Sequence, residues 1–317
     1  MGNKQLIGVI KENISSVIVG KDDVITLILA SVLAGGHILL EDVPGTGKTV
    51  MAKTLAGSID GEFSRIQFTP DLLPSDVTGI NFYNQKAGEF TLRKGPVFAN
   101  ILLADEINRA TPRTQSSLLE CMEEHQVTID GETYRLKEPF TVIATQNPVE
   151  TAGTFPLPEA QLDRFLMKLS MGLPSKEEEI RIMERFMNDI PGSTSGKINA
   201  VCSSRELIDM QAEAAKCYVH RSILQYISDI VDATRNNSGI KLGISPRGTL
   251  ALLRAVKAYA YIDGREYVVP EDVKKLAVPV LAHRLVLTSA FAGSEGKKKV
   301  IEDIVLAVTV PTEEWSR

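Results

Sequence analysis

Apolar and polar residues follow one another along this chain in blocks that predict short buried strands separated by helices. Apolar runs predict strands at 37–41, 63–68, 100–105, 140–145 and 165–170. Apolar residues at helical spacing predict helices over 24–34, 48–56 and 112–124. In the second of these helices, Met51, Ala52, Leu55 and Ala56 share one face. Because strands alternate with helices, the pattern favours an α/β fold with a parallel sheet sandwiched by helices.

Two segments do not fit a minimal sheet of this kind, and each has the pattern of a hairpin. They are 80–92 and 126–136. In the second, Asp130 and Gly131 fit a two-residue type I′ turn, and this register places Val127 opposite Tyr134. The residues alone leave open whether either hairpin has more than a structural role.

After Leu173 the strand pattern gives way to helices. The stretch "LPSKEEEIRIMERF" predicts a helix, and 188–200 is a turn-rich candidate linker. Further helical segments are predicted near 203–216, 220–236, 246–260, 270–285 and 297–308. We therefore expect two domains, an α/β core over 1–198 and a smaller all-helical domain over 199–317.

Composition narrows the class of protein. The 317 residues are 44% hydrophobic and 24% charged, which is typical of a soluble globular protein. A net charge of −5 disfavours a general nucleic-acid binder, and the three cysteines form no CxxC pair. The N-terminal stretch lacks a secretory pattern, and the apolar run "VITLILASVLAGG" is too short to cross a bilayer. We predict a cytoplasmic protein with no membrane span and reduced thiols.

The stretch "HILLEDVPGTGKT" predicts a phosphate-binding loop between a strand and a helix. Lys48 supplies a charge for the β- and γ-phosphates, and the Thr49 hydroxyl is a magnesium ligand in such loops. Gly45 and Gly47 keep side chains out of the way, and Pro44 stiffens the entry. The usual pattern, G-x-x-x-x-G-K-[ST], has glycine where this chain has Asp42. Since like charges repel, we expect Asp42 to turn away from the γ-phosphate, toward neighbouring backbone or the lid.

An acidic pair follows the strand at 100–105. Asp105 and Glu106 end the run "NILLADE", so the strand delivers both carboxylates to the carboxyl edge of the sheet. Asp105 can hold magnesium through water, and Glu106 can orient and deprotonate an attacking water. Asn147 follows the next strand and suits a neutral contact to that water or to the γ-phosphate. A plain helix cap is the structural alternative for the acidic pair.

Two arginines are candidates for completing such a site. Arg164 precedes a strand, and Arg247 lies in the first turn of a helix that Ser245 caps and Pro246 begins. Arginine pairs strongly with phosphate, and an arginine from a neighbouring chain accelerates phosphoryl transfer in other enzymes. A structural salt bridge is equally open for each of them. Arg109 and Arg113 compete for the role in trans.

These pieces, in this order, resemble the AAA+ ATPases, and their details resemble the MoxR family. The resemblance rests on "LLEDVPGTGKT", "DEINRATPRTQSSLLECMEE", "ATQNPVETAGTFPLPEAQLDRF" and "SPRGTLALLRAVKAYA", and it runs from about Val17 to Arg284. An acidic residue before Val-Pro-Gly is common in that family, so Asp42 is consistent with membership. The resemblance implies a P-loop AAA+ core followed by a small all-helical lid.

The resemblance also implies roles for individual residues. Lys48 and Thr49 correspond to Walker A, Asp105 and Glu106 to Walker B, Asn147 to sensor 1, Arg164 to the arginine finger and Arg247 to sensor 2. Whether Arg247 acts in cis or in trans stays open. Nucleotide contacts are expected from Val19, Gly20, Pro44, Gly45, Thr46, Gly47, Lys48, Thr49 and Val50. The hairpins correspond to an insert in the second core helix and a hairpin before sensor 1.

The function implied is Mg²⁺-dependent ATP hydrolysis by a ring-forming motor, typically a hexamer. Such motors remodel or mature partner proteins, often ones with a von Willebrand factor A domain or metal-dependent enzymes.

Three alternatives follow from the same residues. A DNA-translocating motor would need a basic hairpin at 126–136, but Arg135 and Lys137 there are balanced by Asp130 and Glu132. A nucleotide-gated scaffold that does not hydrolyse ATP is disfavoured by the intact acidic pair. A small-molecule kinase is the weakest alternative, because no acceptor-binding segment stands out.

Overall fold

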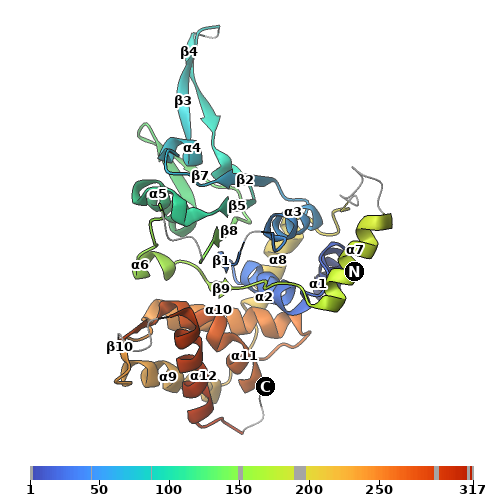
Figure 1. Cartoon of the computed structure of the whole chain (residues 1–317), viewed down its shortest axis with the longest axis vertical. Coiled ribbons are helices and arrows are strands. Elements are labelled where there is room, and N and C mark those ends of the chain that lie inside the picture. The colour runs from blue at the N-terminus through green and yellow to red at the C-terminus, as the bar shows by residue number, and fades with distance from the viewer. Residues whose placement is uncertain are drawn as a thin grey trace. The chain divides into compact units, whose positions relative to one another are not determined.

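A five-stranded sheet forms the centre of the fold, with its strands in the order β2-β5-β8-β1-β9 (Figure 1). The computed structural model describes residues 3–43, 45–86, 88–148, 153–188, 198–288, 293–312 and 315. The sheet strands are β1 (Ile38–Glu41), β2 (Phe63–Gln67), β5 (Ile101–Asp105), β8 (Thr141–Gln146) and β9 (Met167–Leu169). All five strands predicted from the apolar runs are confirmed to within a residue or two.

The central strands run parallel and are buried along almost their whole length. Strand β5 pairs with β2 on one side and β8 on the other, and the register sets Gln67 opposite Asp105. The side chains of Ile101 to Ala104 are fully buried, and only Asp105 at the carboxyl end is partly exposed. A strand without alternation in burial is covered on both faces, as expected for a parallel sheet between helix layers.

Helices account for most of the remaining chain. Their bounds are Asn3–Val17 (α1), Asp22–Leu33 (α2), Lys48–Ser58 (α3), Pro74–Thr78 (α4), Pro112–Glu124 (α5), Glu159–Leu162 (α6), Lys176–Asn188 (α7), Ser204–Ala214 (α8), Arg221–Arg235 (α9), Pro246–Ile262 (α10), Pro270–Leu281 (α11) and Ser294–Ala307 (α12). Short 3₁₀ turns lie at Pro96–Phe98 (η1), Ile107–Arg109 (η2) and Ala282–Arg284 (η3). No helix among the described residues combines the length and the apolar character that a membrane crossing requires.

The chain divides into two compact units. The first comprises Met1–Ile25, Leu39–Leu157 and Ser170–Ile208. Within it, α1 packs against α3 and buries Leu6, Ile7, Ile10 and Ile14, which share one face of the helix. The face of α3 predicted from the sequence is confirmed, because Met51, Ala52, Leu55 and Ala56 are all buried.

Both predicted hairpins are present in the first unit. Strands β3 (Gly79–Asn84) and β4 (Glu89–Lys94) form one, and β6 (Gln126–Ile129) and β7 (Glu132–Arg135) form the other. Figure 1 shows β3 and β4 extending away from the sheet of their unit. In the second hairpin Val127 pairs with Tyr134, and the positive φ angles of Asp130 and Gly131 are those of a type I′ turn. The predicted register is confirmed.

The second unit comprises Thr26–Ile38, Pro158–Leu169 and Asp209–Arg317. Helices α9 to α12 pack against one another in it. A short antiparallel pair accompanies them, β10 (Ile240–Leu242) with β11 (Val286–Leu287), which the helical spacing of the sequence does not predict. As predicted, Ser245 caps α10: its hydroxyl oxygen accepts a hydrogen bond from the N–H of Gly248.

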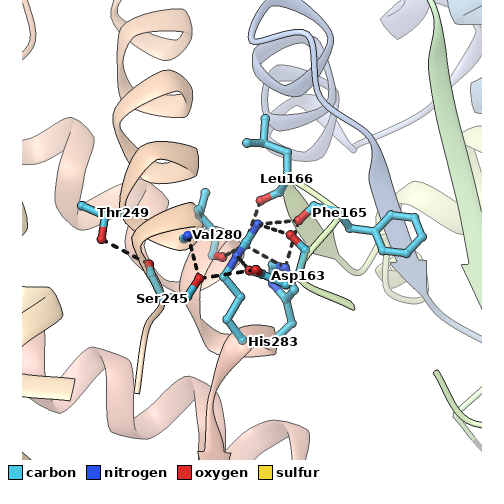
Figure 2. Close-up of polar contacts among 9 residues, drawn as sticks. Asp163, Phe165, Leu166, Ser245, Thr249, Val280 and His283 are labelled. Carbon is cyan, nitrogen blue, oxygen red and sulfur yellow. Dashed lines mark hydrogen bonds and ion pairs between the residues drawn. The ribbon is translucent and has the colours of Figure 1, made fainter. Parts of the chain in front are cut away.

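A buried arginine, Arg284, binds the short segment between α6 and β9, whose residues Asp163, Phe165 and Leu166 are labelled in Figure 2. Arg284 Nε donates to Asp163 Oδ1 at 2.7 Å, and the rest of its guanidinium donates to the carbonyl oxygens of Asp163, Phe165, Leu166 and Val280. Burial lowers the pKa of Arg284 to about 10, so the side chain is still charged at neutral pH. Burial and the adjacent Arg284 charge lower the pKa of His283, so its imidazole is neutral.

Removal of the Arg284 side chain should destabilise the protein strongly. Arg284→Ala leaves a carboxylate and several carbonyl groups without their donor, and breaking such a buried pair costs about 3–5 kcal/mol. Chemical denaturation would measure the loss in the free energy of unfolding. Lys298→Ala is the control, because its ion pair with Glu295 is exposed and should contribute little to stability. Similar losses in both variants would contradict a special role for the buried arginine.

The three cysteines should be unreactive in the native protein. Cys121, Cys202 and Cys217 are buried and form no disulfide, and burial raises the pKa of the Cys121 thiol to about 12 and that of Cys202 to about 11. Because the thiolate is the nucleophile, these two stay protonated and inert at pH 8. We expect a disulfide reagent such as DTNB to label all three only after denaturation. Rapid labelling of the folded protein would contradict this arrangement.

Candidate functional site

The loop between β1 and α3 has the backbone of an anion site. Gly45 and Gly47 both have φ of +87°, a conformation that other residues rarely adopt. Neither has an atom within 4 Å of the position where a Cβ would lie, so the backbone angle rather than crowding requires glycine. The N–H groups of the first turn of α3 receive no side-chain cap. They therefore remain available to an anionic ligand, and the helix dipole favours one.

Lys48 is held by the loop that precedes it. Its ammonium donates to the carbonyl oxygens of Asp42 at 2.9 Å and Val43 at 3.1 Å. An ammonium has three N–H donors, so one donor remains for a ligand oxygen. These contacts fix the charge at the mouth of the loop without neutralising it.

Asp42 turns away from the loop, as expected from the sequence. Its carboxylate accepts hydrogen bonds from Ser170 Oγ at 2.8 Å, Met171 N at 2.7 Å and Gly172 N at 3.1 Å. The expectation that this acidic side chain points toward neighbouring backbone is confirmed. An acidic residue at this position therefore adds no negative charge to the loop's inner surface.

Asp105 lies at the carboxyl end of β5 and is bound on both sides. Thr145 Oγ1 donates to Asp105 Oδ1 at 2.6 Å, and Arg65 Nη2 donates to Oδ2 at 2.7 Å. The Thr145 hydroxyl also accepts from the N–H of Glu106 at 2.8 Å. Strands β2 and β8 thus supply the partners of the residue that ends the strand between them.

Glu106 has an uncommon backbone conformation and a restrained side chain. Its φ and ψ of 56° and 49° lie in the left-handed region, where residues other than glycine are strained. Glu106 Oε2 accepts from Gln67 Nε2 at 2.8 Å and from Arg109 Nη1 at 3.1 Å. The other carboxylate oxygen remains available to accept a proton from water.

A single pocket brings most of the predicted site residues together. Its volume is about 420 Å³, and its lining residues are Gly45, Gly47, Lys48, Thr49, Val50, Arg65, Gln67, Asp105, Glu106, Thr145 and Asn147. The phosphate loop and the acidic pair, about sixty residues apart in sequence, therefore face the same space. Asn147, at the end of β8, is buried beside them.

Three residues that line the pocket were not predicted from the sequence. Arg65 and Gln67 lie on β2, and Thr145 lies on β8. Each stands near the carboxyl end of a predicted strand that flanks β5, where ligand sites of open α/β sheets form. The position near the end of a strand was visible in the sequence. Only the order of the strands in the sheet shows that these strand ends lie beside the end of β5.

Other predicted residues lie elsewhere. The Thr46 hydroxyl donates to the carbonyl oxygen of Val43 at 3.4 Å, and Pro44 lies outside the described residues. Val19 is buried, and Gly20 has φ of +70° with the Glu178 side chain beside it. Neither Val19 nor Gly20 is among the residues that line the 420 Å³ pocket.

The two candidate arginines belong to the second unit. Arg164 lies between Asp163 and Phe165, whose groups Arg284 binds, and Arg247 lies in the first turn of α10. Burial, and next the charge of Arg247, lower the pKa of Arg254 on the same helix. Of the competing arginines, Arg109 contacts Glu106 of its own chain.

The donor set of the pocket fits magnesium. Thr49 and Asp105 both line it and offer oxygen atoms, which Mg²⁺ prefers. Among the described residues no group of three or more His, Cys, Asp or Glu side chains is arranged to hold a metal. Magnesium sites that share the ion with phosphate groups need only one or two protein ligands.

Two family models match the chain. Residues 37–167 match the model described as ATPase family associated with various cellular activities (AAA), and residues 232–304 match the AAA lid domain. The first match contains β1, the phosphate loop and the acidic pair, and the second contains most of α10 to α12. The fold is therefore an AAA+ domain, with a parallel sheet flanked by helices, followed by a helical lid.

Individual relatives match over most of the chain. YeaC of Bacillus subtilis, an uncharacterised protein, is 50% identical over 97% of this chain and 96% of its own length. The chaperone MoxR1 of Mycobacterium tuberculosis is 43% identical over 94% of this chain and 80% of its own. Protein MoxR of Paracoccus denitrificans is 31% identical over 88% of each.

A solved structure agrees with these relatives. A candidate ATPase from Cytophaga hutchinsonii superposes with a TM-score of 0.90 at 42% identity, covering 98% of this chain and 96% of that one. With an AAA core, an AAA lid and MoxR relatives that match most of its length, this chain belongs to the MoxR family of AAA+ ATPases.

Proposed function

We propose that this protein hydrolyses ATP with Mg²⁺ and uses the reaction to remodel or mature partner proteins. The observation that carries the proposal is the shared pocket of Lys48, Thr49, Asp105 and Glu106. A loop that binds phosphate and a carboxylate that activates water are the two requirements for this chemistry. Membership of the family and the chaperone name of one relative support the second half of the proposal.

In the proposed reaction a water oxygen attacks the γ-phosphorus of ATP. The bond from that phosphorus to the oxygen that bridges it to the β-phosphorus breaks, and its electron pair leaves with ADP. The water's proton goes to Glu106, whose Oε2 is held by Gln67 and Arg109 while Oε1 remains available. Lys48 retains one donor for the phosphates, and the amide of Asn147 can position the water without adding charge.

Thr49 and Asp105 are the proposed ligands for Mg²⁺, with Asp105 acting through water. When bound, the ion supplies positive charge to the phosphate oxygens. The hydrogen bond from Thr145 and the ion pair with Arg65 orient the Asp105 carboxylate. Adenine is proposed to lie against Val19 and Gly20, where the Glu178 side chain occupies the space beside the glycine.

Ring formation, with six subunits as the proposed number, would complete each site across a subunit boundary. The proposed finger is Arg164, and the fixed backbone on either side of it supports a role that depends on geometry. Arg247 is the proposed second arginine of the lid. We place the protein in the cytoplasm, as expected from the sequence.

The exposed apolar side chains of the β3–β4 hairpin support the proposal that this protein contacts a partner protein. Ile80, Phe82, Tyr83 and Phe90 are all exposed on it, and Phe90 is 73% exposed. Tyr83 and Phe90 form an exposed apolar pair, and exposed apolar surface of this kind marks interaction sites. The class of client that the resemblance implies is a protein with a von Willebrand factor A domain.

The two central residues can be separated by substitution. Lys48→Ala should abolish nucleotide binding, because the ammonium that meets the β- and γ-phosphates is gone. Glu106→Gln should bind ATP but lower its turnover by about 10²–10⁴-fold, since the amide cannot accept the water's proton. Phosphate release and the binding of a fluorescent ATP analogue measure the two effects.

Two exposed side chains provide matched controls. Lys53→Ala changes the same helix, and Glu120→Gln makes the same chemical change outside the pocket. Both should behave like the wild type. Equal turnover by wild type and Glu106→Gln would remove Glu106 from the role of base, and a wild type that binds ATP without releasing phosphate would favour a scaffold.

Subunit mixing tests whether Arg164 acts in trans. Arg164→Ala alone should lower turnover by about 10³-fold or more, as loss of a trans arginine does in related chemistry. Mixed with Lys48→Ala subunits, which bind no ATP but carry an intact arginine, it should recover activity. The same mixture made with Arg247→Ala reports whether that residue acts in cis or in trans. A protein that stays monomeric with ATP and Mg²⁺, by light scattering, would contradict the ring.

A further inference from the structure

Asp42 is a buried carboxylate at the entry of the phosphate loop. It is only 5% exposed, and its two oxygens accept from three donors in the segment 170–172. Two of those donors are consecutive backbone N–H groups, those of Met171 and Gly172. Successive N–H groups form a concave anion site, and Gly172 has the positive φ, 65°, that such a turn allows. The protein thus uses a backbone anion site to hold one of its own carboxylates.

The backbone of Asp42 connects two other parts of the site. Its N–H donates to the carbonyl oxygen of Gln146 at 3.2 Å, immediately before Asn147. Its carbonyl oxygen accepts from Lys48 Nζ at 2.9 Å. One residue therefore links the charged end of Lys48, the end of β8 and the segment that follows β9. All of these contacts lie within the first unit.

Lys48 contacts the backbone carbonyl of Asp42 and not its carboxylate, and this leaves the ammonium charge available to a phosphate. Lys48 donates to the neutral carbonyl of Asp42, while the negative charge of that residue is bound on the far side by Ser170, Met171 and Gly172. If the carboxylate rotated toward the loop, it would pair with the ammonium and repel a phosphate. The three donors prevent that rotation and fix the carbonyl at the same time.

We infer that Asp42 is a positioning residue for the phosphate loop, which acts on the nucleotide through Lys48. The carboxylate, anchored on 170–172, holds the backbone carbonyl that orients the Lys48 ammonium toward the phosphates. This inference rests on the proposed function, in which Lys48 binds ATP. It accounts for the presence of an acidic residue at a position where the usual loop pattern has glycine.

The three hydrogen-bond donors explain why position 42 requires aspartate. Asparagine has the same shape but only one acceptor oxygen, and its amide would face an N–H or O–H donor. Glutamate is longer by one methylene, which would push the carboxylate through the segment or the carbonyl out of place. Ser170 is exposed and supplies one of the three bonds, so its hydroxyl can be removed with little effect on folding.

The test compares Asp42→Asn, Ser170→Ala and Ser170→Thr with the wild type. We expect Asp42→Asn to lower kcat/KM for ATP by about 10- to 100-fold, as displacement of a catalytic group does. Ser170→Ala should lower it by about 2- to 10-fold, the effect of one hydrogen bond, and Ser170→Thr should restore it. Asp60→Asn is the control, since it removes one exposed carboxylate near the end of α3, where the positive φ suits asparagine.

Two further readouts separate positioning from mere stabilisation. The rise in Tm caused by ATP, taken from each variant's own Tm, should be smaller in Asp42→Asn than in the wild type. Because Ser170 acts through Asp42, adding Ser170→Ala to Asp42→Asn should change kcat/KM no further. If Asp42→Asn does not fold, Ser170→Ala and Ser170→Thr still test the inference.

Each result decides one question. If the wild type hydrolyses ATP and the Ser170 and Asp42 variants have the same kcat/KM as the wild type, the inference is overturned. The proposed function is then unaffected. Losses that only follow the unfolded fraction, with a full ATP-induced rise in Tm, would overturn the inference as well. A wild type that binds ATP but does not hydrolyse it would end the proposed function, and the ATP-induced rise in Tm alone would then decide the role of Asp42.

Discussion

The arrangement of the site depends on the two hydrogen bonds of the Thr145 hydroxyl. It donates to Asp105 and accepts from the N–H of Glu106, so one oxygen atom fixes two consecutive acidic residues. The left-handed backbone of Glu106 is strained by about 1–3 kcal/mol, and it persists because its surroundings determine it. Thr145 can do this only because β8 lies directly beside β5 in the sheet. The placement of the acidic pair is therefore a consequence of strand order.

This dependence explains how much of the site the sequence could predict. The phosphate loop and the acidic pair are each contiguous in sequence, and their flanking strands and helices were predicted correctly. Even the direction of Asp42 followed from charge alone. Gln67 and Arg65 could not be identified in the same way, because their role comes from the register that sets Gln67 opposite Asp105. Apolar periodicity identifies a strand but does not say which strand lies beside it.

In the second unit, too, an important interaction could not be predicted from the sequence, but for a different reason. Arg284 is about 120 residues from Asp163 and Phe165 in sequence, and no local pattern indicates that a buried arginine joins these two residues. Burying a charge is costly, and a well-packed apolar group of the same volume would often be at least as stable. What the guanidinium offers instead is direction, because its planar fork binds a carboxylate and several carbonyls at fixed angles. It holds the backbone on both sides of Arg164, so the geometry of that segment does not depend on its own short helix.

Hydrolysis of ATP by itself does not require the hairpins, so their features must be explained by something other than the reaction. The aromatic residues of the β3–β4 hairpin are the clearest case. Tyr83 and Phe90 pair edge to face with ring centroids 5.4 Å apart, yet both stay exposed, and folding gains little from residues placed there. A protein with an exposed apolar strand risks aggregation unless the surface has a partner. An apolar hairpin on the unit that contains the proposed ATP pocket suits the proposed function, in which a change at the nucleotide is transmitted to another protein.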